Sequence, residues 1–410
     1  MHWDVIVVGA GAAGLVAAER AATRGRKTLL LERNRKPGVK ILMSGGTRCN
    51  LTHATDARGI VAAYGPPGRF LHSALAALGP QDLVALVENE GVPTKVEETG
   101  KVFPVSNRAG DVLAAFLARL RRSGCELALE ESLVQLDRAA EGFRLVTSKR
   151  TLSAGRVIIT TGGQSYPGCG TTGDGYRWAT QLGHSLVPPR PALVPVTTAD
   201  DWARSLSGIT IPDVRLRLIE PGERPRVLDE RRGSLLFAHF GLSGPVVLDI
   251  SRHVSGHPSP QSLRLECDFL PDQRPADLDE RLRRQAAAEG RKQLTALVPA
   301  SLPRRLAEAL VNVAGLAADG KAGELSKAGR AALVQAIKAA SLCVTGTRGF
   351  AKAEVTAGGV PLDEIDSSTM QSKLAPGLFL AGEVLDLDGP IGGYNFQAAF
   401  STGWLAGESV

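Results

Sequence analysis

The sequence has 410 residues, of which 43% are hydrophobic, so it is long enough for two or three domains with buried cores. Its five cysteines include no CxxC pair, which argues against a disulfide framework or a zinc site and favours a reducing cytoplasm. No apolar run approaches the ~18 residues of a membrane helix, and the first strand begins too early for a signal peptide. The net charge of +6 is compatible with an anionic partner such as RNA, but on charge alone scattered arginines on a solvated surface explain it better.

The first predicted elements form a dinucleotide-binding unit. The apolar run at residues 4–8 predicts a buried strand, and residues 15–22, rich in alanine and leucine, predict a helix. A second strand at residues 27–31 ends in Glu32, an acid at the distance from which it can bind ribose hydroxyls. A glycine-rich turn in another kind of α/β domain is the alternative.

Three glycines between the first strand and the first helix complete the motif GxGxxG. Gly9 allows a tight turn, Gly11 lets a pyrophosphate approach the backbone, and Gly14 lets helix and strand pack closely. The helix would then direct its free N–H groups and the positive end of its dipole toward the phosphates.

The next segments alternate between loops and regular elements. Residues 44–52 are rich in glycine and small polar residues and predict a loop, whereas residues 109–123 predict a helix. Residues 125–152 predict a strand and a small antiparallel meander. A strand at residues 156–163 runs into a glycine pair, and residues 170–182 lead into a helix.

Composition changes at a proline cluster in residues 187–191, which we interpret as a domain boundary. Residues 191–274 contain several short strand-like runs and predict a β-rich insert, and residues 275–339 predict a helical insert. Residues 1–190 and 340–410 would then form one discontinuous cofactor-binding domain.

The C-terminal segment favours FAD over a nicotinamide cofactor. An apolar strand at residues 378–383 ends in glycine and acid, and a glycine pair at residues 392–393 precedes a helix at residues 396–405. The N-terminus of this helix would stabilise negative charge on the flavin ring. No second GxGxxG lies between a strand and a helix, so we expect NAD(P)H, if it is the electron donor, to bind only transiently.

Long motifs throughout the chain resemble those of the bacterial BaiN/RdsA-type flavoproteins, also called NAD(P)/FAD-dependent or aminoacetone-oxidase-family enzymes. Two positions depart from the family pattern: Thr47 stands where glycine is common, and Ala238 where threonine is common. The matching motifs are Lys40 with Ser44–Asn50, Lys101–Pro104, Thr161–Pro167, Phe237–Pro245, Thr369–Lys373, Gly377–Asp386 and Gly392–Asn395.

This resemblance implies an α/β fold with a glutathione-reductase-type, Rossmann-like FAD domain, a β-barrel-like insert and a small helical subdomain. It implies redox chemistry of diverse kinds: reduction of carbon–carbon double bonds, including uridine in ribosomal RNA, or oxidation of a small amine such as aminoacetone. We favour reduction of an activated C=C bond, with rRNA as a partner. A flavin-bearing RNA-binding module without turnover is a third hypothesis.

Two residues are our candidates for proton transfer. Cys49 lies next to Arg48, a cation that would lower the pKa of the thiol; the alternative is that Cys49 packs against the flavin ring. His239 lies in the β-rich insert and suits proton transfer near neutral pH; the alternative is a structural histidine. Tyr166 and Tyr394 are more typical of stacking or packing.

The pattern and the resemblance together predict the FAD contacts. Lys40 and Arg48 would offset negative charge, and Asp174 and Glu383 would bind ribose or ribityl hydroxyls, with a helix N-cap as the alternative for Asp174. The predicted cofactor-binding residues are Gly9, Gly11, Ala13, Gly14, Glu32, Arg33, Lys40, Ser44, Gly45, Arg48, Cys49, Asn50, Val134, Thr161, Gly162, Gly163, Asp174, Gly382, Glu383, Asp388, Gly392, Gly393, Tyr394, Asn395 and Phe396. We predict no metal ligand.

Overall fold

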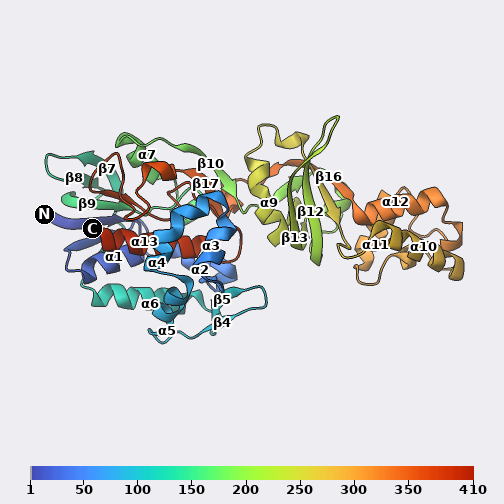
Figure 1. Ribbon diagram of the computed structural model, residues 1–410, viewed down its shortest axis with the longest axis horizontal. Coiled ribbons are helices and arrows are strands. Elements are labelled where there is room, and N and C mark those ends of the chain that lie inside the picture. Colours follow the sequence, from blue (N-terminus) through green and yellow to red (C-terminus); the bar gives the residue numbers. More distant parts are fainter. Residues whose placement is uncertain (1) are drawn as a thin grey trace. The chain divides into compact units, whose positions relative to one another are not determined.

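The computed structural model describes residues 2–410 and divides into two compact units (Figure 1). Unit 1 comprises Met1–Arg190 and Glu354–Val410, and unit 2 comprises Pro191–Ala353. Among the residues described, no single helix is long and apolar enough to cross a membrane, although one bent pair, Pro66–Ala77 with Pro80–Glu88, meets the criteria of length and composition.

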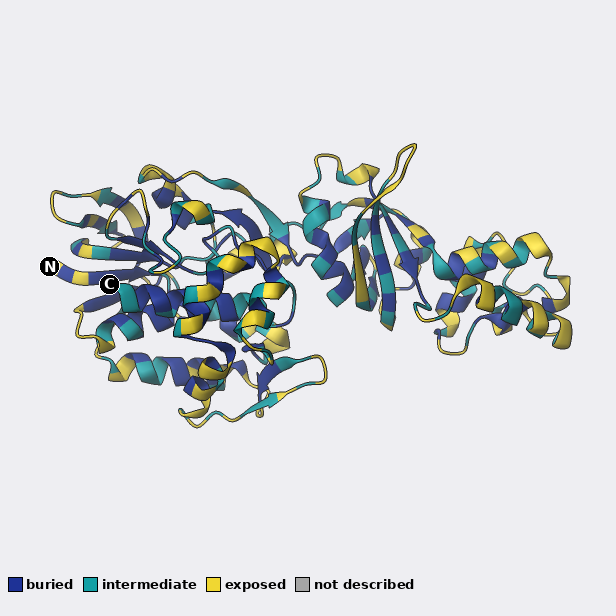
Figure 2. Ribbon diagram, viewed as in Figure 1, coloured by how far each residue is buried: buried dark blue, intermediate teal, exposed yellow. Residues whose placement is uncertain are grey.

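Unit 1 is built on a seven-stranded sheet in the order β6-β2-β1-β9-β8-β7, with β18 also paired to β9. β1, β2, β6, β18 and residues 153–159 of β9 run parallel. The residues at the centre of this sheet, in β2, β18 and the C-terminal parts of β1 and β9, are apolar and buried because helices and loops cover both faces (Figure 2). β7 and β8 form the predicted antiparallel meander on β9. The strands are β1 His2–Val8, β2 Thr28–Leu31, β6 Glu126–Ala128, β7 Leu133–Arg138, β8 Phe143–Thr147, β9 Thr151–Ile159 and β18 Leu378–Leu380.

The first and last helices of the chain pack against each other (Figure 1). Glycines make this close approach possible, because a Cβ atom at Gly403 would lie 2.3 Å from the carbonyl oxygen of Ala13, and one at Gly407 would lie 2.3 Å from that of Ala17. The helices of unit 1 are α1 Ala12–Thr23, α2 Val39–Thr47, α3 Ala57–Tyr64, α4 His72–Ala77, α5 Pro80–Glu88, α6 Ala109–Arg122, α7 Asp174–Gln181 and α13 Tyr394–Ser409, with short 3-10 turns η1 Pro66–Leu71, η2 Pro167–Cys169 and η7 Leu362–Glu364.

Two small sheets complete unit 1. A three-stranded sheet contains β3 Thr52–His53, β5 Lys101–Pro104 and β4 Thr94–Val96, and a two-stranded sheet contains β10 Val187–Ala192 and β17 Val355–Gly359. The segment 44–52, which we expected to be a loop, begins inside α2; the helix is broken there by non-helical backbone at Ser44, Gly45 and Gly46.

Unit 2 contains a closed barrel in the order β11-β14-β13-β12-β15-β16. Its last strand corrects our boundary, because residues 340–347 belong to the barrel and not to the cofactor-binding domain. β16 pairs with both β15 and β11, and this closure removes the exposed strand edges. The strands are β11 Val196–Thr198, β12 Thr210–Glu220, β13 Arg226–Ala238, β14 Gly241–Ser243, β15 Arg264–Asp268 and β16 Ala340–Thr347.

The helical part of unit 2 shares one apolar core with the barrel. Leu278, Leu306 and Leu333 from the helices belong to the same buried cluster as Leu216 and Phe237 from the strands. The expected α/β, Rossmann-type fold with a barrel and a helical subdomain is confirmed. The helices are α8 Asp201–Ser205, α9 Pro245–Ser255, α10 Pro275–Ala288, α11 Arg304–Val313 and α12 Lys327–Lys338, with 3-10 turns η3 Pro260–Ser262, η4 Leu294–Leu297, η5 Ala322–Glu324 and η6 Phe350–Lys352.

Candidate functional site

The glycine motif between β1 and α1 has the geometry of a phosphate-binding turn. Gly9 has a φ of +102°, and a Cβ atom there would lie 2.9 Å from the carbonyl oxygen of Thr160. A Cβ atom at Gly14 would lie 1.8 Å from the carbonyl oxygen of Gly9, so α1 approaches the turn closely. At Gly11, by contrast, no atom lies within 4 Å of a Cβ position, which leaves the backbone open to a ligand.

Thr160 at the end of β9 holds this turn in place, and sequence reasoning missed it. Its buried hydroxyl lies 2.9 Å from the carbonyl oxygens of both Val8 and Gly9. A threonine directly after a buried strand was the only signal in the sequence. The neighbouring hydroxyl of Thr161, a predicted FAD contact, is buried without a hydrogen-bond partner among residues 2–410.

Glu32 lies at the end of β2, beside the glycine turn. Its carboxylate oxygens accept hydrogen bonds from the backbone N–H groups of Ala10, at 2.9 Å, and Asn34, at 2.8 Å. Burial nevertheless raises the pKa of Glu32, because desolvation outweighs these hydrogen bonds. Each oxygen keeps a second lone pair, so the carboxylate can still accept from ribose hydroxyls.

Arg33 and Asp174, predicted as separate FAD contacts, form an ion pair with each other. Arg33 Nη1 lies 2.8 Å from Asp174 Oδ2 and 2.7 Å from Thr172 Oγ1, and both charged side chains are partly exposed. The pair joins the loop after β2 to the start of α7. Gly173 is the N-cap of α7, so the alternative role of Asp174 as the N-cap is wrong.

Lys40 and Glu383 also pair, across 343 positions of the chain. Lys40 Nζ donates to Glu383 Oε2 at 2.6 Å and to Ser165 Oγ at 2.6 Å, and Ser165 Oγ donates to Glu383 Oε1 at 2.7 Å. The backbone N–H of Thr356 donates to the same carboxylate at 2.9 Å. This network connects α2, the segment after β9, β17 and the segment after β18, and the charge of Lys40 is already balanced within it.

The structure does not support activation of Cys49 by Arg48. Arg48 Nη1 lies 2.6 Å from Glu97 Oε1, and the Cζ atom of Arg48 lies 3.9 Å from the centroid of the Phe103 ring, over which the guanidinium stacks. The side chain of Cys49 is fully buried in the apolar core, and burial raises the pKa of the thiol to about 12. Our expectation of a lowered pKa is therefore wrong, and a thiol without exposed surface does not reach a substrate.

Gly382 brings the C-terminal part of the chain to the glycine motif. It has a φ of +77°, and a Cβ atom there would lie 3.0 Å from the Cβ atom of Ala13. Its backbone N–H donates to Thr402 Oγ1 at 3.0 Å. Two predicted contacts that are 369 positions apart are therefore neighbours, because α13 packs on α1.

The N-terminus of α13 rests on β3. A Cβ atom at Gly393 would lie 2.5 Å from the backbone of Thr52, and the carbonyl oxygen of Gly392 lies 3.1 Å from His53 Nδ1. The His53 ring stacks on Tyr394 with 4.6 Å between centroids. The first N–H groups of the helix have no partner within it, so this end can stabilise negative charge.

Other predicted contacts of the C-terminal segment also interact with residues of the chain itself. The side chain of Asn395 bonds back to the N–H and the carbonyl oxygen of Gly389, at 2.8 and 2.9 Å. Phe396 stacks on Phe400 with 6.0 Å between centroids. Asp388 is buried and raises the pKa of Tyr64, which burial raises first.

Further predicted contacts lie along β7 and the loops of unit 1. Val134 has an exposed side chain, and its carbonyl oxygen accepts from Arg177 at 3.1 Å. Gly163 packs so tightly that a Cβ atom would lie 2.4 Å from Thr356 Oγ1. The remaining predicted contacts lie outside regular secondary structure: Ser44 and Gly45 at the break in α2, Asn50 before β3 and Gly162 after β9.

His239 belongs to unit 2, in the two-residue turn between β13 and β14. Its side chain is exposed and lies edge-on to Phe240, with 5.0 Å between centroids, and its carbonyl oxygen accepts from Arg204 Nε at 3.2 Å. The pairing of Ala238 with Gly241 closes the turn on both sides of His239. Its imidazole makes no hydrogen bond within residues 2–410. The role in proton transfer remains a prediction.

The residues of unit 1 fit FAD. The open backbone at Gly11, the buried carboxylate of Glu32 and the contact between Gly382 and Ala13 provide the surroundings of a dinucleotide. The hydroxyls of Thr161 and Tyr176 are buried and make no hydrogen bond within the described chain. A ligand with phosphate and hydroxyl groups would satisfy such donors.

Comparisons relate the chain to known proteins. The model of the HI0933-like protein Rossmann domain matches residues 3–409. The chain is 33% identical over 412 residues to the ribosomal RNA dihydrouridine synthase of Escherichia coli (strain K12), covering 100% of this chain and 98% of that protein. It is 32% identical over 411 residues to the 3-dehydro-bile acid delta(4,6)-reductase of Clostridium scindens, covering 98% of each.

A solved structure shares the fold. The 3-ketosteroid-delta4-(5alpha)-dehydrogenase from Rhodococcus jostii RHA1 superimposes with a TM-score of 0.50 and 16% identity, covering 100% of this chain and 96% of that chain. At this identity the likeness shows the fold alone.

Proposed function

Because the chain belongs to the HI0933-like family of Rossmann-domain proteins, we propose that it reduces a carbon–carbon double bond conjugated with a carbonyl group, and that its substrate is uridine in ribosomal RNA. The chain is an FAD-dependent oxidoreductase. One observation carries the finer proposal: two relatives that span the whole chain are named for reductions of this type. A uracil ring and a 3-dehydro bile acid with delta(4,6) double bonds both carry a C=C bond next to a carbonyl.

FAD, when bound, supplies hydride transfer, and we propose NAD(P)H as the source of the electrons. The chain's own residues bind and orient it: the turn from Gly9 to Gly14 receives the pyrophosphate, and Glu32 accepts from ribose hydroxyls. The N-terminus of α13 offers its N–H groups to negative charge. We expect the ion pair of Lys40 and Glu383 to keep the loops around this site together.

Reduction of a C=C bond also requires a proton at the second carbon. Of the two predicted donors, Cys49 is fully buried and His239 has an exposed side chain, so we propose His239 as the proton donor. Ala238 beside it contributes no hydroxyl, although threonine is common at this position in the family.

The decisive experiment combines a gene deletion with the purified enzyme. We expect rRNA from the deletion strain to lack one dihydrouridine, detected by mass spectrometry of nucleosides. The holoenzyme with NAD(P)H should restore it in that rRNA, and heat-inactivated enzyme should not. In the absence of oxygen, NAD(P)H should bleach the flavin absorbance and unmodified rRNA should restore it.

Two outcomes would contradict the proposal. Unchanged dihydrouridine in the deletion strain would remove rRNA as the substrate. Bleaching of the flavin by aminoacetone, without bleaching by NAD(P)H, would identify an amine oxidase instead.

A further inference from the structure

Gln397 is a polar residue near the start of α13, and its side chain is completely buried. Thr52 Oγ1 donates to its Oε1 atom at 2.6 Å, and its Nε2 atom donates to the carbonyl oxygen of Leu78 at 3.0 Å and to Ser401 Oγ at 2.9 Å. Ser401 Oγ in turn donates to the same carbonyl oxygen at 2.7 Å. Both amide hydrogens and the amide oxygen of Gln397 therefore have partners within residues 2–410.

The partners of Gln397 come from three places in the chain. Thr52 belongs to β3, Leu78 follows α4, and Ser401 lies one turn further along α13. A buried polar network whose members are all satisfied holds one arrangement, because any displacement leaves a buried donor or acceptor without a partner. The side chain of Gln397 thus fixes α13 on β3 and on the end of α4.

The same strand contacts the turn that precedes α13. A Cβ atom at Gly393 would lie 2.5 Å from the carbonyl oxygen of Thr52, so the two backbones touch. The amide of Asn50, in the orientation that satisfies both of its polar atoms, accepts from the backbone N–H of Gly393 at 2.9 Å and donates to the carbonyl oxygen of Thr52 at 3.1 Å. The position at which α13 begins is therefore set by β3 and the residues next to it.

We propose that Gln397 and Thr52 are positioning residues for the flavin, which hold the N-terminus of α13 where its dipole stabilises negative charge on the reduced ring. The inference rests on the proposed function, in which this end of α13 offers its N–H groups to that charge. The effect of a helix dipole falls off within about one turn, so a small displacement of the helix weakens it. Reduction adds negative charge to the ring, so such a displacement should affect reduced FAD more than oxidised FAD.

The test compares Thr52→Val with Thr52→Ser in the FAD-loaded enzyme. Valine keeps the shape of the side chain but removes the donor to Gln397, whereas serine keeps the hydroxyl. The midpoint potential of the flavin is measured without oxygen against a reference dye, and the Kd of oxidised FAD is measured by fluorescence titration.

We expect Thr52→Val to reduce the preference for reduced over oxidised FAD about threefold to tenfold, which lowers the potential of the two-electron couple by about 15–30 mV. The Kd of oxidised FAD should change by less than about threefold, because the oxidised ring carries no negative charge for the dipole to stabilise. Thr52→Ser should keep the preference within about twofold of the wild type, since the hydrogen bond is retained.

Gln397→Met tests the other side of the same contact. The carbonyl oxygen of Leu78 keeps the hydroxyl of Ser401 as a donor, while the link from α13 to β3 is lost. This variant should lower the potential similarly, and it decides the question if Thr52→Val does not fold. The double variant should lose no more than either single variant, because both changes remove one interaction.

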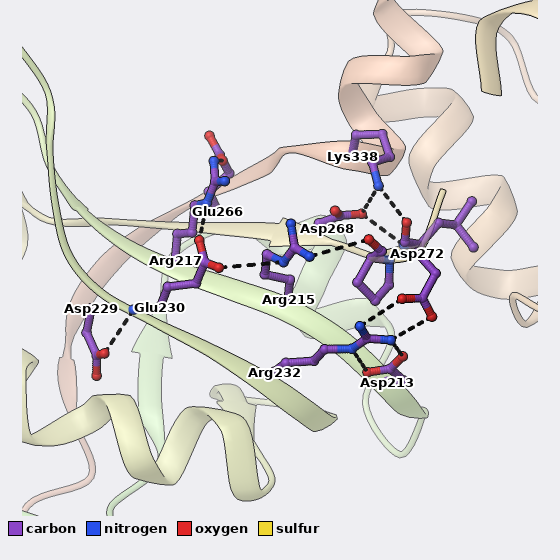
Figure 3. Close-up of polar contacts among 12 residues, drawn as sticks. Asp213, Arg215, Arg217, Asp229, Glu230, Arg232, Glu266, Asp268, Asp272 and Lys338 are labelled. Atoms are coloured by element: carbon purple, nitrogen blue, oxygen red, sulfur yellow. Dashed lines mark hydrogen bonds and ion pairs between the residues drawn. The ribbon is translucent and has the colours of Figure 1, made fainter. Parts of the chain in front are cut away.

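Two controls separate positioning from a general loss of stability. Thr28→Val makes the same change at a buried residue of β2, whose hydroxyl donates to the carbonyl oxygen of Arg26 at 3.0 Å. Arg232→Gln removes ion pairs of unit 2 with Asp213 and Asp272, each at 2.7 Å (Figure 3). Both should keep the preference for reduced FAD within about twofold of the wild type at any change of melting temperature, because neither touches the network around Gln397.

The inference is overturned if Thr52→Val and Gln397→Met keep the wild-type potential, or if Thr52→Ser or a control lowers it as much as they do. Equal losses of affinity for oxidised and reduced FAD would also overturn it, because they would show a structural role alone. Dihydrouridine formation is measured in the same samples. Variants with the expected potentials, made from a wild type that forms no dihydrouridine, would contradict the proposed function and not this inference.

Discussion

At the residue scale, neighbours in the sequence point in different directions in the loop that follows the break in α2. Thr47 and Cys49 both have positive φ angles, of +69° and +63°, and these turn the backbone between them. Arg48 consequently contacts Glu97 and Phe103, while Cys49 enters the core. Adjacency along the chain therefore did not produce the electrostatic contact that we expected.

The first prediction concerns Cys49→Ala. Because the thiol is buried and its pKa is about 12, it stays neutral between pH 6 and 9, so the variant should keep the wild-type pH profile of kcat/KM. Loss of the sulfur atom should cost about 1 kcal/mol of stability. Iodoacetamide should not label Cys49 in the native enzyme at pH 8, which peptide mass spectrometry can check. A shifted basic limb of the profile would restore Cys49 as a catalytic candidate.

The second prediction concerns Thr47→Gly. A β-branched residue is strained in the left-handed region, and glycine is not, so the variant should be more stable by about 1 kcal/mol. Ala62→Gly, on the exposed face of α3, is the control and should lose about 1 kcal/mol. Denaturant unfolding of the two variants measures both changes, and a loss of stability in Thr47→Gly would be evidence against strain at this position.

The third prediction compares two adjacent threonines in the protein without FAD. Thr160→Val removes the hydroxyl that holds the glycine turn and should cost about 1–3 kcal/mol, because the carbonyl oxygen of Gly9 loses this donor, whereas that of Val8 keeps the backbone N–H of Thr160. Thr161→Val removes a buried hydroxyl without a described partner and should be neutral or stabilising. Equal losses in thermal unfolding would show that Thr160 has no special role.

At the element scale, α1 and α13 form the connection on which the cofactor site depends. α1 carries the glycine motif at its N-terminus, and α13 brings Gly382 and its own N-terminus to the same region. Gly403 and Gly407 are spaced four residues apart and allow the two backbones to meet. We had predicted the final helix but not this glycine contact, because spacing in one helix does not identify its partner.

The fourth prediction tests this contact. Gly407→Ala would place a methyl group 2.3 Å from the carbonyl oxygen of Ala17, so the helices must move apart. We expect a loss of about 1–3 kcal/mol and weaker FAD binding. Gly110→Ala in α6, where no atom lies within 4 Å of a Cβ position, is the control and should be neutral or slightly stabilising. Fluorescence titration with FAD measures the affinity; wild-type affinity in Gly407→Ala would contradict the argument.

At the scale of the whole molecule, the chain forms two units with separate cores, and FAD is expected to bind unit 1. Ligand binding stabilises the unit that binds, and about 2.7 kcal/mol is gained at a hundredfold excess of ligand over Kd. The chain offers a reporter for each unit, since Trp202 belongs to unit 2 and Trp3, Trp178 and Trp404 belong to unit 1.

The fifth prediction follows from this division. Calorimetry should show two unfolding transitions, of which FAD raises only the one that belongs to unit 1. Trp202→Phe should remove the fluorescence change of the transition that does not respond to FAD. A single transition in which all tryptophans respond together to FAD would show that the two units unfold as one.

Elements whose signals are local could be predicted from the amino-acid sequence. The first strand, the glycine turn, the first helix and Glu32 form one continuous pattern, because a buried parallel strand is apolar throughout and a tight turn requires glycine. Family motifs spread along the chain were likewise sufficient to predict the α/β fold and the flavin chemistry.

The pairings between distant segments became visible only in the folded chain. Lys40 with Glu383, Arg33 with Asp174 and Gly382 with Ala13 are joined by chain folding, and no periodicity encodes which charge meets which. β16 follows the helical part in the sequence, but it belongs to the barrel because it pairs with both β15 and β11 and so closes the sheet. Burial decided the state of Cys49 in the same way, since desolvation depends on every segment that surrounds the thiol.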